Sequence, residues 1–410
     1  MLINVERHLK TKIIPFWKKL KDYEYDGFYG SVDSFTLEIK KHAQKGLVQQ
    51  ARNLWSFSAM KNHFNSDDYL PYMMSAYRYL MNSLKDRENQ GFYWLSTYQG
   101  KILDERKITY GQGFVIYALA EYYKATKDET ALNEAMKLFN LIEEKAKDPI
   151  TSAYWEEFDS SWQKSDCLIL GDGVLNTVYT LNTTLHLLEA YTNLYEATHQ
   201  NSIRNAIISI LNFFTNHLYD AEKRTLHCYL NQQLESLNSM VSFGHNIETA
   251  WLVDEASEAI NYHNDAIRAM TKNLTEEVYR DGFYNGYVQN HRIGYERDTQ
   301  IIWWVQSESL VGFYNHYQKT NEYAYLHACE KVWETINQCL VDPRNDGEWF
   351  WSCQECSKPN YDRGEAELWK TPYHNSRALI QLIERMNKHA STSEVFRTSK
   401  TTQPTHRTKE

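Results

Sequence analysis

The chain has 410 residues, of which 42% are hydrophobic and 24% are charged, and its formal net charge is −9. This composition is ordinary for a globular protein with a large core, and the negative charge without any long Lys/Arg run argues against nucleic acid or an acidic membrane surface as the main partner. Charges interrupt the start of the chain and no later stretch approaches about 18 uncharged apolar residues, so we expect a cytoplasmic protein without a signal peptide or membrane span.

A short aromatic cluster, most often led by glycine, returns six times between stretches of helical periodicity. It begins at Gly27, Gly91, Ala153, Leu226, Gly282 and Gly347, which gives steps of 64, 62, 73, 56 and 65 residues. Each interval has room for two helices of about 15 to 20 residues. The glycines suit a tight turn with positive φ that leads into a short extended segment.

The spacing of apolar residues places most of the helices coarsely. They are expected near residues 3–20 and 45–63, 129–146 and 175–197, 201–218 and 243–260, 264–279 and 300–318, and 322–340 and 371–388. A single helical hairpin cannot bury both of its apolar faces, so the six hairpins must stack.

We therefore predict an all-α fold, an (α/α)6 barrel of six helical hairpins in a closed toroid with short extended loop segments. An open helical solenoid is the alternative that the same period permits. The barrel would occupy residues 1–388 as a single domain. Residues 389–410, rich in Ser, Thr, Lys and Arg, would form a disordered tail.

Polar side chains recur at the start of the second helix of each hairpin. If the first helix is outer and the second inner, these residues face the barrel axis at one end of the ring. They include Arg52, Tyr110, Asn182, His186, His245, Glu248, Trp303, Trp304 and His374. Each hairpin thus contributes one or two side chains to a single candidate site.

Two interpretations of His245 compete. His245 and Glu248 lie three positions apart on one helix face, so the carboxylate could orient the imidazole. A lone histidine beside Ile247 and Trp251 is, however, more often a hydrogen-bonded core residue. The equivalent positions of His186, His245 and His374 in three different hairpins favour a catalytic role for His245 and His374.

Neighbouring residues could support such a site. Asn182, four positions before His186, could fix the tautomer of that imidazole or reach a hydroxyl, and Arg52 offers a positive fork for an oxygen that gains charge. Of the adjacent tryptophans 303 and 304, at most one is expected to face the axis. Trp369, in a connection rather than a helix, is a better candidate for an exposed stacking surface.

Other functional classes remain open on these residues alone. An inverting glycoside hydrolase needs two carboxylates across the scissile bond. Candidates are Glu156, Glu157, Asp159, Asp172 and Glu308. A catalytically silent sugar-binding barrel is a further option. The six cysteines are scattered through a large chain and are expected to be free thiols. Cys353-x-x-Cys356 has no second Cys or Cys/His pair at zinc spacing, so we expect no metal site.

The chain resembles the N-acylglucosamine 2-epimerase superfamily, and within it most closely the cellobiose 2-epimerases. The resemblance covers nearly the whole chain. Its most specific motifs are LHLLEAY (185–191), GHNIETAW (244–251), WWVQSE (303–308) and PYHN (372–375).

This resemblance implies an enzyme that inverts C2 at the reducing-end glucose of a β-1,4-linked disaccharide without metal or nucleotide cofactor. Matching positions imply that His245 and His374 form the acid/base pair, assisted by His186. They also imply that Arg52, Tyr110, Asn182 and Glu248 bind the sugar, while Trp304 and Trp369 stack on it. The expected partner is a small sugar, and the expected state is a monomer or weak dimer.

One segment departs from the family pattern. Residues 367–372 read ELWKTP, whereas cellobiose-acting members often have GPWKCP before the last histidine. This segment would border the second sugar. A mannose/glucose 2-epimerase or an aldose–ketose isomerase of the same superfamily therefore stays as an alternative.

Overall fold

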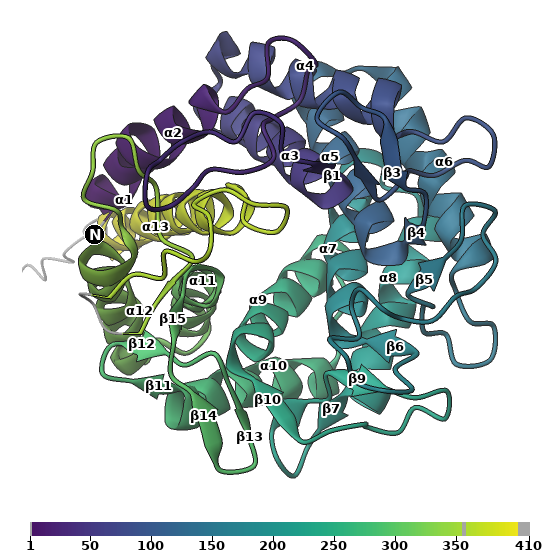
Figure 1. Ribbon diagram of the computed structural model, residues 1–410. Helices are drawn as coiled ribbons and strands as arrows, with labels where there is room; N and C mark the ends of the chain where they lie inside the picture. Colours follow the sequence, from purple (N-terminus) through teal and green to yellow (C-terminus); the bar gives the residue numbers. More distant parts are fainter. Residues whose placement is uncertain (1, 355–357, 401–410) are drawn as a thin grey trace, which may run out of the picture.

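The computed structural model describes residues 2–354 and 358–400, whose helices form two concentric rings around one axis (Figure 1). Each inner helix contacts the next, and the last contacts the first, so the ring is closed. The inner helices are α3 (Leu47–Phe64), α5 (Thr109–Thr126), α7 (Leu181–Thr198), α9 (Phe243–Ala259), α11 (Trp303–Thr320) and α13 (Tyr373–Lys400). The predicted (α/α)6 barrel is confirmed, and the open solenoid is excluded.

The outer ring surrounds the inner one (Figure 1). After the first, each outer helix packs mainly against the inner helix that precedes it in the chain, and the first packs against α13. The outer helices are α1 (Leu2–His8) continuing into α2 (Ile14–Lys19), then α4 (Leu70–Tyr79), α6 (Glu129–Lys145), α8 (Asn201–Phe213), α10 (Asp265–Glu277) and α12 (Tyr323–Thr335). Five π-helical turns extend or join them, at Leu9–Ile13, Leu80–Leu84, Phe214–Leu218, Val278–Gly282 and Ile336–Leu340. A single 3-10 turn, Asp67–Tyr69, precedes α4.

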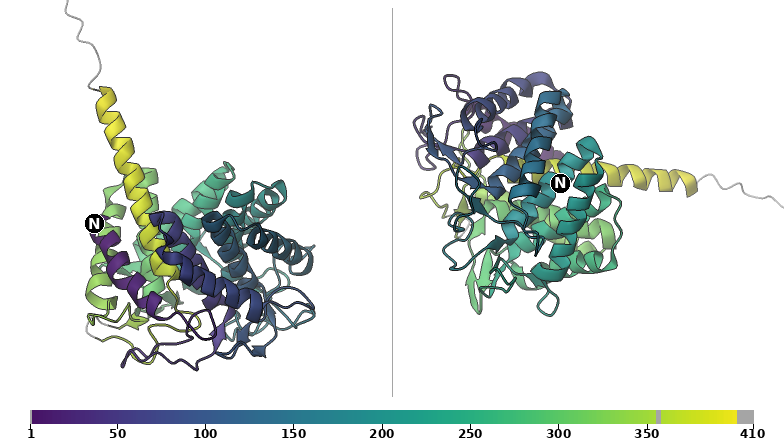
Figure 2. Two further views of the ribbon diagram at one scale, coloured as in Figure 1. Left: turned by 90° about the horizontal axis from the view of Figure 1, so that it is seen from above. Right: turned by 90° about the vertical axis from the view of Figure 1, so that its right-hand side faces the viewer.

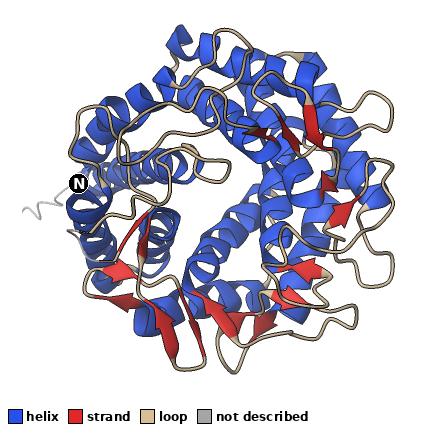
Figure 3. Cartoon of the chain, viewed as in Figure 1, coloured by secondary structure: helices blue, strands red, loops and turns tan. Residues whose placement is uncertain are grey.

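The strands are short and lie in the connections (Figure 3). They are β1 (Lys45–Gly46), β2 (Leu95–Ser96), β3 (Ile102–Asp104), β4 (Lys107–Ile108), β5 (Glu157–Phe158), β6 (Tyr179–Thr180), β7 (Tyr219–Asp220), β8 (Thr225–Leu226), β9 (Tyr229–Leu230), β10 (Met240–Ser242), β11 (Phe283–Tyr284), β12 (Tyr287–Val288), β13 (His291–Ile293), β14 (Glu296–Asp298), β15 (Ile301–Ile302) and β16 (Ser352–Cys353). All pairs are antiparallel, in the orders β1-β2-β3, β10-β13-β14, β4-β5, β6-β9, β7-β8, β11-β12 and β15-β16. Strands β1, β4, β6, β10 and β15 directly precede inner helices, so pairing fixes where those helices begin.

The recurring aromatic clusters are attached to the inner helices by side-chain amides. Gln50 of α3 accepts a hydrogen bond from the Phe28 backbone N–H and donates one to its carbonyl, at 2.8 and 2.9 Å. Gln112 repeats this arrangement at Phe92, and Gln306 repeats it at Val288. Several of the polar residues on the inner helices therefore hold the repeat together.

The glycines of these clusters serve two purposes. Gly27 and Gly91 adopt φ of +69° and +71°, as the turn prediction requires. The prediction is wrong for Gly282, which ends a π-helical turn without positive φ. There a Cβ atom would lie 2.7 Å from the Phe243 ring, so close packing requires the glycine.

Most helix boundaries fall within a few residues of those expected. Helix α7 begins at Leu181 rather than near 175, because residues 179–180 pair as β6 and the Thr180 side chain accepts a hydrogen bond from the Thr183 N–H. Helix α13 runs to Lys400, beyond the boundary expected at 388, and projects from the barrel (Figure 2). Residues 401–410 lie outside the described residues.

The structure bears on the predicted state of the cysteines. Cys339 is disulfide-bonded, which corrects the expectation of free thiols throughout. Cys167, Cys228, Cys329 and Cys353 are free, and Cys356 lies outside the described residues.

In the described part of the chain, no helix combines the length and apolar character needed to cross a bilayer.

Close packing between α9 and α11 gives a testable prediction at Gly312. A Cβ atom there would lie 2.3 Å from Ile247 Cγ1 and 3.2 Å from the Ile247 carbonyl oxygen. We expect Gly312→Ala to lower the free energy of unfolding by about 1–3 kcal/mol, because overpacking outweighs the better helix propensity of alanine. Urea denaturation measures this change. The double variant Gly312→Ala/Ile247→Ala should lose less than the sum of the single variants, and strict additivity would contradict the steric explanation.

Candidate active site

A pocket of about 350 Å³ opens at the N-terminal end of the inner helices. Its lining contains all nine residues that the sequence singled out as catalytic or sugar-binding. They are Arg52, Tyr110, Asn182, His186, His245, Glu248, Trp304, Trp369 and His374. The lining also contains Trp303, so the expectation that at most one of the two adjacent tryptophans faces the site is wrong. Trp351 and Arg363, which were not assigned to the site, line it as well.

The helix starts explain why these residues converge. Tyr110, Asn182, Trp304 and His374 are each the second residue of an inner helix, and His245 is the third. The positive ends of several helix dipoles therefore point toward the pocket, an arrangement that stabilises negative charge. The barrel provides an environment suited to an anionic intermediate.

His245 is held by the residue that caps its helix. The Ser242 hydroxyl lies 2.9 Å from His245 Nδ1 and also accepts a hydrogen bond from the His245 backbone N–H. Burial, with a smaller contribution from the charge of His186, lowers the pKa of His245 to about 3. The imidazole is therefore neutral near pH 7 and able to accept a proton.

Glu248 does not orient His245, which corrects the prediction from their spacing. Its Oε1 accepts a hydrogen bond from Arg377 Nη2 at 2.7 Å and lies 4.0 Å from His186 Nε2. Ion pairing with a buried guanidinium outweighs a contact with a neutral imidazole. Glu248 Oε2 is buried without a hydrogen-bond partner in the described residues, so it is available to a ligand hydroxyl.

His374 pairs with a carboxylate from another helix. Its Nδ1 lies 2.6 Å from Glu308 Oε1, while Glu308 Oε2 accepts hydrogen bonds from Trp251 Nε1 and Arg377 Nη2 at 3.1 and 2.8 Å. Burial, together with Arg52 and Arg377, lowers the pKa of His374 well below its usual value. Burial also outweighs Arg377 and raises the pKa of Glu308. The carboxylate fixes the imidazole with Nε2 free.

His186 has a similar carboxylate partner on its own helix. Its Nδ1 lies 2.9 Å from Glu189 Oε2, which also accepts a hydrogen bond from the Tyr373 hydroxyl at 2.5 Å. Burial acts to raise the pKa of Glu189, but Arg377 and the hydrogen bond to His186 outweigh it and lower that pKa to about 2. The expectation that Asn182 fixes this imidazole is wrong, because Glu189 already occupies Nδ1.

Aromatic rings and Arg52 form the rest of the wall. The Trp304 ring centroid lies 4.9 Å from that of His245 and 5.7 Å from that of His374, so this tryptophan contacts both histidines. Trp303 also lines the pocket but packs on Trp351. Arg52 donates hydrogen bonds to the Trp369 carbonyl at 3.1 Å and the Tyr110 hydroxyl at 2.7 Å, and its buried Nε has no partner in the described residues.

The carboxylates proposed for a hydrolase lie elsewhere. Glu156 bonds to Thr180 and Thr183, Glu157 pairs with Arg106, and neither lines this pocket. Asp159 and Asp172 are also absent from the lining. Glu308 is enclosed by His374, Trp251 and Arg377. The pocket thus lacks the pair of facing carboxylates that inverting hydrolysis requires.

One group of side chains has the composition of a metal site. Glu248, Glu308 and His374 each offer a ligand atom, and these atoms lie within 4.8 Å of one another. Arg377 already places its guanidinium 2.7 Å from Glu248 and 2.8 Å from Glu308. The arginine therefore supplies the positive charge that a cation would bring to these carboxylates.

The environment of Glu248 predicts a pH dependence of stability. Burial, and next the charge of Glu308, raise the pKa of Glu248 from 4.5 to about 7. Because the folded state holds this proton more tightly than the unfolded chain does, the free energy of unfolding falls as the pH rises from 4.5 to about 7. We expect Glu248→Gln to flatten the decline, as measured by urea midpoints across this window. Parallel curves for the two proteins would contradict this expectation.

Fold and site together define an isomerase of the (α/α)6-barrel class that acts on sugars through proton transfer. Two neutral histidines, a buried arginine and several tryptophans converge where helix dipoles favour negative charge. The chain belongs to the N-acylglucosamine 2-epimerase family, whose model matches residues 27–378.

Relatives within the family agree with this assignment. The chain is 40% identical to a cellobiose 2-epimerase of Dictyoglomus turgidum, over 92% of this chain and 97% of that protein. It is 33% identical to a cellobiose 2-epimerase of Ruminococcus albus, over 94% and 99% of the two chains. A solved structure of cellobiose 2-epimerase from Bacillus thermoamylovorans superposes with a TM-score of 0.91 at 36% identity, covering 94% of this chain and 99% of that one.

Proposed function

We propose that the protein is a 2-epimerase that interconverts the reducing-end glucose and mannose of a β-1,4-linked disaccharide, with cellobiose giving glucosyl-mannose. The observation that carries this proposal is the presence of two neutral histidines, the half-buried His245 and the buried His374, that contact one tryptophan in one pocket. The identity to curated cellobiose 2-epimerases supports the disaccharide as substrate.

The proposed reaction begins with the open-chain sugar, because its aldehyde acidifies the C2 proton. Nε2 of one histidine takes this proton, and the electron pair moves through C2–C1 to the aldehyde oxygen to give an enediolate. The other histidine, which must first take up a proton from solvent, delivers it to the opposite face of C2. The imidazoles return to their starting states by exchange with solvent, and no metal or nucleotide takes part.

The remaining residues would bind the sugar and stabilise charge. Arg52, with the helix N-termini, would stabilise the negative oxygen of the enediolate. Tyr110, Asn182 and Glu248 would bind hydroxyl groups, and His186 would assist near the ring oxygen or O1. Trp304 and Trp369 would stack on the sugar rings.

We further propose that the protein acts in the cytoplasm as a monomer or weak dimer. Size-exclusion chromatography with light scattering tests the second statement. A stable higher oligomer would contradict it.

The function is tested by incubating the protein with cellobiose, glucose or mannose in D₂O and following C2 by NMR. We expect deuterium at C2 together with the new epimer, and a higher kcat/KM for cellobiose than for the monosaccharides. Absence of both exchange and epimer with every sugar would refute the proposal. A preference for mannose, or a ketose as the main product, would support the alternative activities, and release of glucose from cellobiose would indicate hydrolysis.

A further inference from the structure

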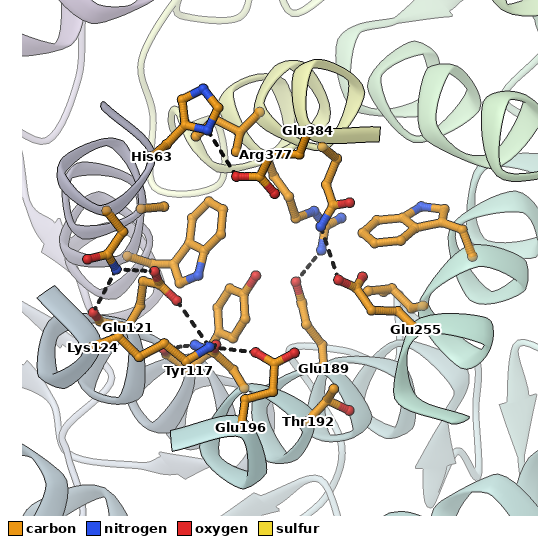
Figure 4. A pocket seen from close by; sticks show the side chains of 18 residues that line it. His63, Tyr117, Glu121, Lys124, Glu189, Thr192, Glu196, Glu255, Arg377 and Glu384 are labelled. Atoms are coloured by element: carbon orange, nitrogen blue, oxygen red, sulfur yellow. Dashed lines mark hydrogen bonds and ion pairs between the residues drawn. The ribbon is translucent and has the colours of Figure 1, made fainter. Parts of the chain in front are cut away.

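A second cavity, of about 410 Å³, lies at the C-terminal end of the inner helices, opposite to the active-site pocket (Figure 4). We call it the distal cavity. Its side chains come from α3, α5, α7, α9 and α13, and they include Glu121, Lys124, Glu196, Glu255 and Glu384. None of these residues has a part in the proposed epimerisation.

The charge of the distal cavity favours a cation. Among the described residues that line the cavity, the carboxylates of Glu121, Glu189, Glu196, Glu255 and Glu384 meet two lysine or arginine side chains, Lys124 and Arg377. His63, also in the lining, lies 2.9 Å from Glu384. Arg377 is shared among Glu189, Glu248 and Glu308. Lys124 pairs with Glu196 at 2.6 Å and Glu121 at 3.7 Å. The negative ends of the surrounding helix dipoles add to the excess of negative charge.

Glu255 is the carboxylate with the least compensation. Its Oε1 accepts a hydrogen bond from the Gln381 amide at 3.1 Å, and no lysine or arginine in the described part of the chain forms an ion pair with it. Burial raises the pKa of Glu255, although nearby Arg385 partly offsets this effect. An ammonium group beside Glu255 would neutralise the cavity where it most lacks positive charge.

Two buried donors indicate that the ligand also accepts hydrogen bonds. Trp55 Nε1 and Arg377 Nε have no hydrogen-bond partner in the described residues, although these side chains are only 6% and 2% exposed and both line the cavity. Buried N–H groups without partners are costly. An amine alone cannot satisfy them, whereas hydroxyl groups can accept from them and donate to the carboxylates.

From these observations we propose that the distal cavity binds a small hydroxylated amine, of the amino-alcohol or amino-sugar class, with its ammonium group at Glu255 and its hydroxyls toward Trp55 and Arg377. This site goes beyond the proposed epimerase function and does not depend on it. The walls of the cavity, which include Trp55, Tyr117 and Trp251, offer apolar surface for the carbon chain.

The distal cavity is connected to the active site through its floor. Arg377 and Glu189 line the cavity, while Arg377 binds Glu248 and Glu308 and Glu189 binds His186 on the active-site side. A ligand that changes the position of Arg377 therefore acts on both carboxylate–histidine pairs. We expect occupancy of the cavity to change kcat of the epimerisation.

Isothermal titration calorimetry tests the site with three matched probes, in the presence of saturating cellobiose. Glucamine carries an amine and hydroxyls, sorbitol carries only hydroxyls, and hexylamine carries only the amine. We expect one equivalent of glucamine to bind about tenfold more tightly than either of the others, because each of them lacks one set of contacts. Glucamine binding that disappears with cellobiose would place it in the active site and overturn the proposal, as would equal affinity for sorbitol.

Variants locate the binding. Glu255→Gln should weaken glucamine about tenfold by removing a charged partner, and Trp55→Phe about fivefold by removing the indole N–H while keeping a ring. Glu334→Gln, a surface substitution on α12, is the control and should leave the affinity unchanged. Unchanged affinity in Glu255→Gln, or no heat with wild-type protein, would refute the site. Neither result depends on whether the protein epimerises cellobiose.

Discussion

Replacing His374 with alanine is expected to lower kcat for C2 epimerisation by about 10²–10⁴-fold, and replacing His245 should have an effect of the same size. Each histidine is neutral near pH 7, so each can accept a proton, but neither can substitute for the other on the opposite face of C2. Loss of either one therefore removes inversion while leaving the pocket otherwise intact.

Isotope exchange separates this mechanism from a structural role. In D₂O the remaining histidine can still remove and return a proton on its own face. His374→Ala should thus exchange the C2 proton of one epimer only, and His245→Ala that of the other, with little inversion in either variant. His217→Ala, a substitution in the π-helical turn after α8, is the control and should keep full activity. Exchange of both epimers in a single variant would refute the two-base mechanism.

The sequence predicted the barrel well because the aromatic cluster that separates the helical stretches occurs six times in the chain. A period of roughly 64 residues, with helical spacing in each interval, leaves few architectures that bury the apolar faces. Position in the repeat then brought eight of the nine site residues to one end of the ring, and Trp369 came from a connection. This inference needed one assumption, that the second helix of each hairpin is the inner one. The structure has that order.

The same reasoning could not separate functional from structural polar residues. Gln50, Gln112 and Gln306 occupy inner helices near the site residues, yet the first two bind the backbone of an aromatic cluster and Gln306 binds that of Val288, in the strand paired with one. Each of the three lies in the first turns of an inner helix, as Arg52 and His186 do, so position in the repeat does not separate them. Only the direction of the side chain, which the sequence does not reveal, distinguishes the two groups.

Partner assignments failed for a related reason. The sequence suggested neighbours on the same helix, such as Glu248 for His245 and Asn182 for His186. His186 does pair with a neighbour on its own helix, Glu189, but the partners of His374 and Glu248 are distant in the sequence. Glu308 binds His374 at a separation of 66 residues, and Arg377 binds Glu248 at 129. A buried charge is stabilised by an opposite charge, which can come from another helix across the barrel axis. The spacing of residues within one helix cannot reveal such pairs.

Glu308→Gln is the substitution that tests this network most directly. Glutamine keeps the shape of the side chain but removes the negative charge 2.6 Å from His374 Nδ1, so the imidazolium formed during proton removal loses its counter-charge. We expect kcat to fall by about 10²–10³-fold, similar to the loss of other preorganised electrostatic partners. The effect should fall mainly on C2 exchange at the face that His374 serves, measured by NMR in D₂O.

A matched variant separates this charge effect from loss of the Arg377 ion pair. Glu189→Gln also removes a carboxylate partner of Arg377, but its imidazole contact is His186. Both variants should lower stability by about 3–5 kcal/mol, the usual cost of breaking a buried ion pair, so thermal unfolding gives a common reference. If Glu308→Gln slows exchange at both faces equally, as Glu189→Gln would through Arg377, then Glu308 acts by positioning the arginine and not by supporting His374. Selective loss at one face assigns Glu308 to His374.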